Sequence, residues 1–335
     1  MTNLVSHSGA PRFGWLKEPV SEVNFQDYPL QNTMDNQVNG WRKNFKFNQF
    51  HFIGLLGPDF MAGIAIVNLK LVSNCFYYVW HKEHGLLVEE SKLAPMGLGT
   101  NIGTSPDLGA SRFLLPGTQC YFEQHNEVTR VRLKTKHVNA ELTLTQNKGY
   151  QPLRVCSQAG YNGWVFTQKT AGLDCSGYLN VKDHNFELSK MDVLGSADWS
   201  CGFMRRETAW NWACLSGRDA EARQIGLNLA SGVNETGITE NGFWVDGTLH
   251  KLGPVRFSFN RHSPEEPWRV ESDCDRVKLT FQPEGKRTEK VNVGVLASNF
   301  KQMFGYYSGS LVTDQGEEIQ LKNQPGFAED HYAKW

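Results

Sequence analysis

Hydrophobic and polar residues alternate with a period of two along much of the chain. In residues 138–145, which read VNAELTLT, every second residue is apolar, so the apolar side chains lie on one face of a strand. The same alternation recurs at residues 225–229, 255–259 and 277–281. Successive side chains of a strand point to opposite faces, so each stretch predicts an antiparallel strand with one buried face. The pattern therefore predicts a protein built mostly of strands.

Turn-forming residues separate these stretches. They stand at Asn147-Lys148-Gly149, Asp246-Gly247, Pro283-Glu284-Gly285 and Asp314-Gln315-Gly316, and residues of these types favour turns. Helical periodicity is confined to two short candidates, residues 219–223 and 298–304. The segment 96–117, rich in Gly, Ser and Pro, predicts a long ordered loop. Many strands with almost no helix favour barrels or sandwiches over an α/β sheet.

The length of 335 residues is enough for two domains. We predict an N-terminal β domain over residues 1–170 and a C-terminal β domain over 171–335. Hydrophobic residues make up 40% of the chain and charged residues 21%, which is typical of a globular protein with a buried core.

The charge balance argues against nucleic acid or a membrane surface as a partner. The formal net charge is −1, so there is no global basic field. The basic run at residues 130–134 alternates with apolar residues and predicts the outer face of a strand. The longest apolar run, residues 61–69, is too short to span a bilayer.

The remaining composition predicts a cytoplasmic protein. The first twenty residues contain no apolar run of the kind that a signal peptide has, and the seven cysteines are widely spaced without a CxxC pair. This spacing favours reduced, buried thiols over disulfides or a zinc knot. His81 and His84 alone do not complete a zinc site, so we expect neither a metal nor a cofactor.

Candidate chemistry is concentrated between Asp198 and Gly247, where tryptophans are interleaved with amides and charged residues. In a strand, Trp210 and Trp212 share one face and Asn211 lies on the other. Aromatic rings with a few amides suit a small organic ligand. A tryptophan-rich barrel core with amides in turns is the alternative interpretation of the same residues.

The candidate residues fall into three sets. The candidate acids are Glu207, Glu235 and Glu240; the candidate proton acceptors are Asp198, Asp330 and His331; and the candidate substrate-binding residues are Trp210, Asn211, Trp212, Asn228, Asn234, Asn241, Trp244, Arg206 and Lys169. Carboxyl groups and an imidazole are the usual acid/base groups of enzymes. The alternative for the C-terminal residues is a terminal segment anchored by its last tryptophan.

Several of these motifs carry a family resemblance. The segments FTQK (166–169), GFMRRETAWNWA (202–213), GLNL (226–229) and EDHYAKW (329–335) resemble the bacterial family called domain of unknown function 2804. That family is in turn distantly similar to the two-domain lipocalin-type proteins that include carotenoid 1,2-hydratase and certain fungal cyclases. The resemblance implies two calycin-like antiparallel β domains, as barrels or sandwiches, with a cavity for lipophilic ligands in or between them.

Three functions follow from this reading. The favoured one is a cofactor-independent enzyme of hydratase, isomerase or cyclase type that acts on a lipophilic small molecule by acid/base chemistry. The second is a non-catalytic binding or carrier protein. The third is a carbohydrate-active enzyme, in which tryptophans stack on sugar rings and two carboxyl groups flank the scissile bond.

Overall fold

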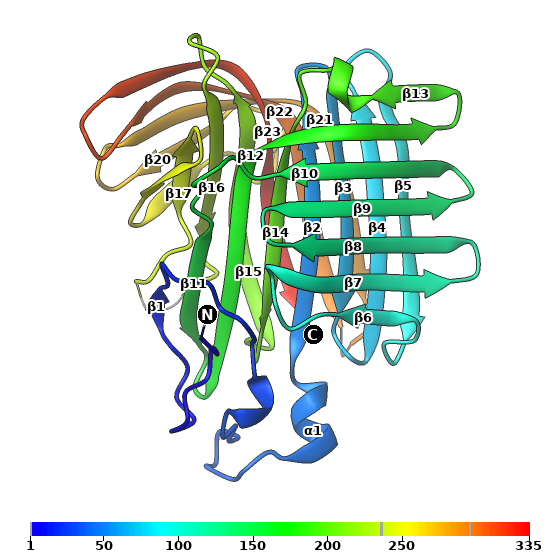
Figure 1. Ribbon diagram of the computed structural model, residues 1–335, viewed down its shortest axis with the longest axis vertical. Helices are drawn as coiled ribbons and strands as arrows, with labels where there is room; N and C mark the ends of the chain where they lie inside the picture. The colour runs from blue at the N-terminus through cyan, green and yellow to red at the C-terminus, as the bar shows by residue number, and fades with distance from the viewer. Residues whose placement is uncertain (1, 235–236, 295) are drawn as a thin grey trace.

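The computed structural model describes residues 2–234, 237–294 and 296–335 and consists almost entirely of antiparallel strands. Its helical parts are α1 (Gly40–Phe45) and two single 3-10 turns, η1 (Phe25–Asp27) and η2 (Leu188–Lys190). Within the described ranges, no helix is long and apolar enough to cross a membrane. The strands form two large sheets, which Figure 1 shows in blue to green and in green to red.

The first sheet contains fourteen strands from the N-terminal part of the chain. They are β1 (Gly14–Trp15), β2 (Asn48–Leu56), β3 (Phe60–Asn68), β4 (Val72–His81), β5 (Gly85–Pro95), β6 (Thr100–Ile102), β7 (Leu108–Leu115), β8 (Thr118–His125), β9 (Val128–Thr135), β10 (Val138–Thr145), β11 (Leu153–Ala159), β12 (Gly163–Val181), β13 (His184–Glu187) and β14 (Leu194–Gly202). The order is β5-β4-β3-β2-β14-β12-β10-β9-β8-β7-β6, with β11 and β13 on β12 and β1 on β11. In Figure 1, β7 to β10 run across the view while β2 to β5 run up it, so the sheet curls around its own core.

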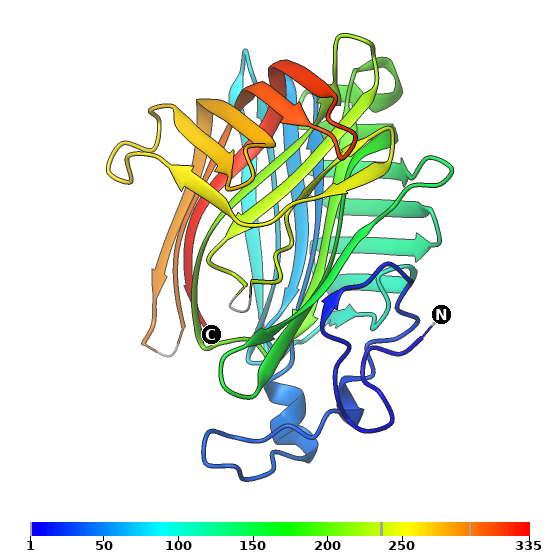
Figure 2. The same ribbon diagram turned by 90° about the vertical axis from the view of Figure 1, so that its left-hand side faces the viewer.

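The second sheet contains nine strands in the order β18-β17-β16-β15-β23-β22-β21-β20-β19. They are β15 (Glu207–Arg218), β16 (Gln224–Ser231), β17 (Gly242–Val245), β18 (Thr248–Lys251), β19 (Val255–Ser258), β20 (Trp268–Ser272), β21 (Val277–Asn292), β22 (Ala297–Val312) and β23 (Glu318–Lys334). Figure 2 shows this sheet, in yellow to red, crossing in front of the blue and cyan strands of the first.

Alternation along the strands explains why there are three main apolar layers. In β2, Ile53 and Leu55 point into the core of the first sheet, whereas Phe52 and Leu56 point toward the second sheet. In β15, Ala213 and Leu215 point into the core of the second sheet. The third layer lies between the sheets, and we call it the inter-sheet layer. Its buried apolar members are Phe52, Leu56, Met61, Ala65, Tyr78, Trp80, Trp212, Cys214, Ala230, Phe304, Tyr306 and Phe327.

Two glycines make room for large rings in the inter-sheet layer. A Cβ atom on Gly63 would clash with the ring and hydroxyl of Tyr78, and a Cβ atom on Gly54 would meet Ser196 and the Phe327 ring. Gly54 and Gly63 are cross-strand partners in β2 and β3. Gly63 thus makes room for Tyr78 within the first sheet, and at Gly54 the Phe327 ring of the second sheet comes close to the backbone of the first.

The N-terminal segment covers one end of the first sheet, as Figure 2 shows in dark blue. Leu4, Val20 and Val23 are fully buried in the core of that sheet. The rings of Phe25 and Phe47 stack with their centroids 3.8 Å apart. This segment therefore closes an otherwise open end of the core.

The change from one sheet to the other falls between β14 and β15, at residues 203–206. Strand β12 runs without interruption through the position predicted as a domain boundary, residues 170 and 171. Residues 1–170 and 171–335 as separate domains therefore remain a proposal, and the sheets suggest residues 203–206 as the alternative boundary.

Several predicted local structures need correction. Residues 298–304, predicted as a helix, belong to β22, and residues 219–223 form a turn. The predicted loop at 96–117 contains the whole of β6 and of β7. Pro283–Gly285 is a register shift inside β21 rather than a turn. At 96–117 and 283–285 the Gly and Pro residues were interpreted as loop or turn signals, but long bent strands tolerate such residues at bulges.

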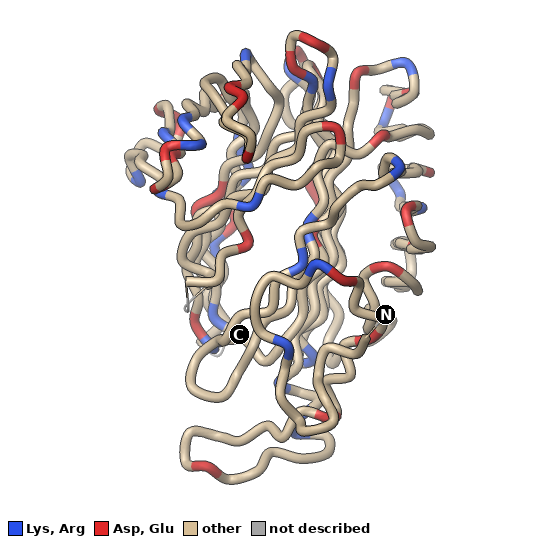
Figure 3. The backbone as a smooth tube through the Cα atoms, turned by 60° about the vertical axis from the view of Figure 1, so that its left-hand side comes forward, with Lys and Arg blue, Asp and Glu red and all other residues tan. Residues whose placement is uncertain are grey.

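Other predictions are confirmed. The stretches at 138–145, 225–229 and 277–281 lie in strands β10, β16 and β21, and Arg130 and Arg132 are on the exposed face of β9. All seven cysteines are free thiols, five of them buried. Acidic and basic positions are interspersed along the chain, which Figure 3 shows in red and blue.

Candidate functional site

Two rows of side chains face each other in the inter-sheet layer. One row crosses the first sheet through paired positions on five strands; we call it the Lys169 row, and it comprises Lys169, Asp198, Phe52, Ala65 and Phe76. The other crosses the second sheet; we call it the Arg287 row, and it comprises Ala230, Trp212, Glu329, Gln302 and Arg287.

Ring contacts show that the two rows lie against each other. The ring centroids of Phe52 and Trp212 are 6.0 Å apart, and the Arg287 guanidinium carbon lies 4.8 Å from the centroid of the Phe76 ring. Because neighbouring strands hold the register of each row, the charged groups at both ends have fixed positions in an apolar surrounding.

Lys169 is the centre of the first charged group. Its Nζ lies 2.5 Å from a carboxylate oxygen of Asp198 and 3.6 Å from one of Glu240. The Ser200 hydroxyl donates to Asp198 at 2.7 Å. The Lys169 and Glu240 side chains are each 6% exposed, so these charges interact in a poorly screened environment.

Burial changes the proton affinities in this group. Burial by itself would lower the pKa of Lys169, but the charges of Asp198 and Glu240 outweigh it and the pKa is raised. Burial raises the pKa of Glu240, the charge of Lys169 opposes the rise, and the charge of Asp198 adds to it. Lys169 is therefore held as a cation, and Glu240 holds its proton more tightly than an exposed carboxyl does.

A chain of hydrogen bonds positions Glu240, which lies in the loop before β17. Trp212 Nε1 donates to Asn228 Oδ1 at 2.8 Å, and Asn228 Nδ2 donates to the Glu240 carbonyl at 2.7 Å. Asn234 Oδ1 accepts from the Glu240 amide at 3.3 Å. Asn241 accepts from the Ala230 amide and donates to the Gly253 carbonyl. These predicted binding residues therefore orient the loop that carries Glu240.

Glu329 is the central carboxyl group of the Arg287 row. Gln302 Nε2 donates to its Oε1 at 2.6 Å. Burial raises the pKa of Glu329 to about 7, against the lowering influence of Arg287 and Gln302, and the charge of Asp198 contributes to the rise. Asp198 and Glu329 lie on different sheets, and the charge of Asp198 is close enough to act on Glu329.

Arg287 closes the outer end of its row. Its Nε donates to Glu89 Oε1 at 3.0 Å, and its guanidinium lies over the rings of Phe76, Tyr78 and Phe300 at 4.7–4.8 Å. The Arg287 side chain is 4% exposed, whereas that of Glu89 is 32% exposed. The ion pair therefore stands at the boundary between the inter-sheet layer and solvent.

The C-terminal candidates divide between two faces of β23. The His331 ring lies 4.2 Å from the Trp210 ring, and its Nε2 is 3.1 Å from the Ser298 hydroxyl. Burial and the charge of Arg287 lower its pKa to about 3. Asp330 instead interacts with Arg261 and Asn211. Successive residues of a strand point to opposite faces, so Asp330 does not orient the imidazole.

The other predicted residues lie away from the two rows. Glu207 is exposed and forms an ion pair with Lys334 at 3.5 Å, and Arg206 is exposed as well. Trp244 is buried, stacks on Tyr150 and donates from Nε1 to the Gln151 carbonyl. Glu235 lies outside the described residues. The structure thus groups Lys169, Asp198 and Glu240 and separates them from Glu207 and Arg206.

Sequence reasoning missed Glu329, Gln302, Arg287 and Tyr78. Gln302 and Glu329 stand at positions where the alternation of β22 and β23 places apolar residues, between Phe300 and Phe304 and after Phe327. A polar residue on an otherwise apolar face is the signal that could have identified them. The helix predicted at 298–304 concealed it.

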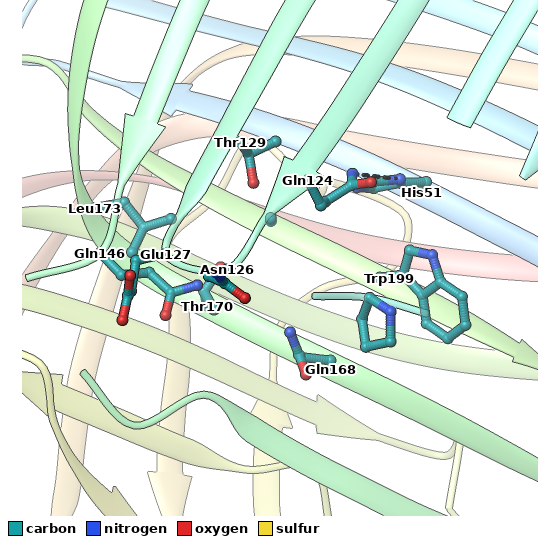
Figure 4. Close-up of a pocket in the computed structure, with 12 residues that line it drawn as sticks. His51, Gln124, Asn126, Glu127, Thr129, Gln146, Gln168, Thr170, Leu173 and Trp199 are labelled. Atoms are coloured by element: carbon teal, nitrogen blue, oxygen red, sulfur yellow. Dashed lines mark hydrogen bonds between the residues drawn. The ribbon is translucent and has the colours of Figure 1, made fainter. Parts of the chain in front are cut away.

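A second polar cluster lies inside the core of the first sheet, around a cavity of about 20 Å³. Figure 4 shows Gln124 against the His51 ring, with Gln168 and Trp199 around the same space. The Ser111 hydroxyl is 2.9 Å from His51 Nδ1, and burial lowers the pKa of His51 to about 3. Such a volume suits a water molecule rather than an organic substrate.

In the described part of the chain, no three His, Cys, Asp or Glu side chains are grouped so that they could hold a metal ion. The charged groups of the two rows consist of carboxyls, a lysine and an arginine. Their chemistry is proton transfer and the binding of polar oxygen atoms.

Comparisons with known proteins are consistent with this architecture. A family model described as Domain of unknown function (DUF2804) matches residues 1–335. No curated protein matches the chain.

Among solved structures, that of CghA with Sch210972 has a TM-score of 0.53 and 8% identity, covering 99% of this chain and 97% of CghA. A second CghA structure has a TM-score of 0.52 and 9% identity, covering 100% and 97%. Kievitone hydratase from Nectria haematococca has a TM-score of 0.48 and 10% identity, covering 96% and 98%. The CghA similarity extends over the whole chain and confirms the predicted fold class, a mostly β, lipocalin-like protein with two curled antiparallel sheets.

Proposed function

The chain belongs to the family described as Domain of unknown function (DUF2804), and from that premise we propose that it is a cofactor-independent enzyme for acid/base chemistry on a lipophilic small molecule. The reaction is of hydratase, isomerase or cyclase type. The observation that carries the proposal is the position of Glu329, a buried carboxyl with a pKa near 7, across the inter-sheet layer from the Asp198–Lys169 ion pair.

Glu329 is the proposed proton donor. A carboxyl whose pKa is about 7 is substantially protonated at neutral pH and can still release its proton. Gln302 holds it in place at 2.6 Å. It would protonate a double bond or an oxygen atom of a substrate in the inter-sheet layer.

Asp198 is the proposed proton acceptor. The Lys169 ammonium and the Ser200 hydroxyl hold its carboxylate in position. In an isomerisation or cyclisation, proton donation by Glu329 and abstraction by Asp198 leave the number of substrate atoms unchanged. In a hydration, Asp198 would take a proton from the attacking water. Glu240 sits on the other side of Lys169 and supports its charge.

The lining of the layer favours a lipophilic substrate. The rings of Phe52 and Trp212 belong to the two rows and Phe327 packs beside them. Aromatic faces stabilise positive charge that develops on protonation. CghA, which has a similar fold, has been solved with the small molecule Sch210972. This supports a small-molecule site in such a fold.

The carbohydrate alternative fits less well. A glycosidase keeps the space between its two carboxyl groups for the glycosidic bond. Asp198 and Glu240 do not flank such a space, because the Lys169 ammonium contacts both of them.

We also place the enzyme in the cytoplasm, because seven free thiols suit a reducing compartment.

Native mass spectrometry of purified wild type and Glu329→Gln tests the proposal. The amide variant cannot donate a carboxyl proton, so it should retain unconverted substrate, whereas wild type retains product or nothing. For a hydratase the two bound molecules differ by the mass of one water; for an isomerase or cyclase they have equal mass and different chromatographic retention.

Glu207→Gln is the matched control, because Glu207 is an exposed carboxyl outside the two rows. This variant should retain the same molecule as wild type. An identical ligand in wild type and Glu329→Gln would instead identify a carrier. A bound saccharide would overturn the choice of substrate class.

A further inference from the structure

Three buried polar atoms belong to side chains that are neighbours in the inter-sheet layer. They are the Tyr78 hydroxyl, Arg287 Nη1 and Gln302 Oε1, and none has a hydrogen-bond partner among the residues that the structure describes. Tyr78 is fully buried, Gln302 is 1% exposed and Arg287 is 5% exposed. Buried polar atoms are nearly always paired in native proteins, so three unpaired atoms together need a physical explanation.

The three side chains are direct neighbours although they come from both sheets. Arg287 and Gln302 are cross-strand partners in β21 and β22. Tyr78 enters from β4 of the first sheet, and the Arg287 guanidinium carbon lies 4.7 Å from the centroid of its ring. Arg287 is also held by its bond to Glu89 and Gln302 by its bond to Glu329, while the Tyr78 ring packs over Gly63. The unpaired atoms are therefore held in position.

We propose that Tyr78, Arg287 and Gln302 form a binding subsite for a carbonyl or carboxylate oxygen of the ligand. Arg287 Nη1 and the Tyr78 hydroxyl donate to this oxygen, and Gln302 Oε1 accepts from a hydroxyl group next to it. The inference rests on the proposed function only in taking the inter-sheet layer as the ligand site.

The surroundings define the rest of the ligand. The rings of Phe76 and Phe300 lie on the Arg287 guanidinium at 4.8 Å, so the atoms next to the bound oxygen contact aromatic faces. This arrangement suits an aryl or conjugated alkenyl group attached directly to the carbonyl or carboxylate. The substrate class is accordingly a conjugated carbonyl compound or carboxylic acid.

The subsite has a solvent-exposed neighbour at Glu89. Glu89, the partner of Arg287, has a side chain that is 32% exposed, and it is located on β5 at the end of the first sheet. A ligand that reaches Arg287 from this side passes the Glu89 carboxylate. Glu89 therefore repels an anionic ligand and has less effect on a neutral one.

Three probes of the same shape test the subsite by isothermal titration calorimetry. They are trans-cinnamate, which carries a carboxylate; benzylideneacetone, which carries a ketone; and β-methylstyrene, which has no oxygen. Wild type should bind the first two more tightly than the third. Tyr78→Phe should weaken the first two by about five- to twentyfold, the usual effect of one lost hydrogen bond, and leave β-methylstyrene within about twofold.

Tyr307→Phe is the matched control. Tyr307 is equally buried, but its hydroxyl donates to the Phe327 carbonyl at 2.7 Å, and its ring packs in the core of the second sheet. This variant should lose stability and keep probe affinity. Tyr78→Phe should keep its melting temperature, because the hydroxyl that it removes has no partner within the described chain.

Glu89→Gln supplies a second measurement of opposite sign. Removal of the carboxylate from the Arg287 side chain should strengthen cinnamate binding by about threefold or more and leave benzylideneacetone nearly unchanged. The subsite would be overturned if wild type bound all three probes with equal affinity or did not bind cinnamate at millimolar concentration. It would also be overturned if Tyr78→Phe bound the probes as wild type does. A crystal soaked with cinnamate that shows only water between the three side chains would also overturn it.

These measurements record binding and not turnover. Suppose that Tyr78→Phe weakens probe binding, but wild type and Glu329→Gln retain the same natural ligand. This result would support the subsite and reject the proposed enzyme. The reverse pattern would reject the subsite alone.

Discussion

The Lys169 ammonium and the Asp198 carboxylate lie 2.5 Å apart and occupy directly opposed positions on β12 and β14. Both side chains are largely buried, with 6% and 16% exposed. An ion pair in such surroundings depends on both partners, because either charge alone would remain buried without compensation.

Loss of the cation should therefore destabilise the protein. We expect Lys169→Met to lower the free energy of unfolding by about 3–5 kcal/mol at pH 7, since it leaves Asp198 and Glu240 without their shared partner. Urea denaturation measures the effect. Lys334→Met is the control, because the Lys334–Glu207 pair is exposed and its loss should cost less than about 1 kcal/mol. A Lys169→Met protein as stable as wild type would show that the pair is dispensable.

Glu329 should make the protein less stable as the pH rises. Its pKa in the folded state is raised to about 7, so between about pH 4.5 and 7 the folded state binds a proton that the unfolded state has released. Stability contributed by the protonated carboxyl is complete below this window and lost above it. Glu329→Gln should match wild type near pH 5 and exceed its stability by about 3 kcal/mol near pH 8.

Denaturation curves of both proteins at several pH values provide the test. Asp330→Asn is the comparison, because that carboxylate pairs with Arg261 on the other face of the same strand. A difference between wild type and Glu329→Gln that does not vary with pH would contradict the assignment.

His51 should have the opposite effect in acid. Burial lowers its pKa to about 3 in the folded state, while the unfolded state takes up a proton near pH 6.5. Stability should therefore fall as the pH drops from about 6.5 toward 3. His51→Gln removes this contribution, so its melting temperature should fall less steeply than that of wild type over the same range. Parallel curves would indicate that His51 is not neutral in the folded protein.

Close packing of the Tyr78 ring over Gly63, its cross-strand partner in the first sheet, gives a packing prediction. A Cβ atom there would clash with the Tyr78 ring, and overpacking of this kind costs about 1–3 kcal/mol. Gly63→Ala should lose that much stability and regain part of it when combined with Tyr78→Leu. Gly253→Ala is the control, since a Cβ on Gly253 has nothing within 4 Å and should be nearly neutral.

Turnover should depend on the carboxyl groups of the two rows. Once the natural ligand has been identified, Glu329→Gln and Asp198→Asn should each lower kcat by about 10²–10⁴-fold, the usual contribution of general acid/base catalysis. Glu207→Gln should retain activity, because that carboxyl is exposed and paired with Lys334. Full activity of both row variants would refute the mechanism.

The fold class could be predicted from the sequence because alternation of apolar and polar residues indicates which face of a strand is buried. Residues 138–145 predicted β10 and the face that it buries, and the same argument placed Trp210 and Trp212 on one side of β15. Local patterns could not show which sheet each face contacts. That information comes from pairings between distant strands, such as β2 with β14.

The site could be predicted only in part, because local patterns do not show which distant strands lie together. Lys169, Asp198 and Glu240 were all named as candidates, yet their grouping required β12, β14 and the loop before β17 to meet. Glu329 was overlooked because its segment was interpreted as a terminal anchor. Arg287 lies in the middle of a strand, in the stretch EGKRTEK, where alternating charges resemble an exposed edge. Burial against the other sheet cannot be deduced from such a stretch.

The ion pair between Arg287 and Glu89 joins residues that are 198 positions apart in the chain. Contacts of such long range form late in folding, because the loop that they close is costly in entropy. The Lys169 row belongs to the part of the chain that is synthesised first, and the Arg287 row, except for its members on β15 and β16, to the last part. The inter-sheet layer, in which we propose the ligand site, is therefore complete in a growing chain only after its C-terminal strands have emerged.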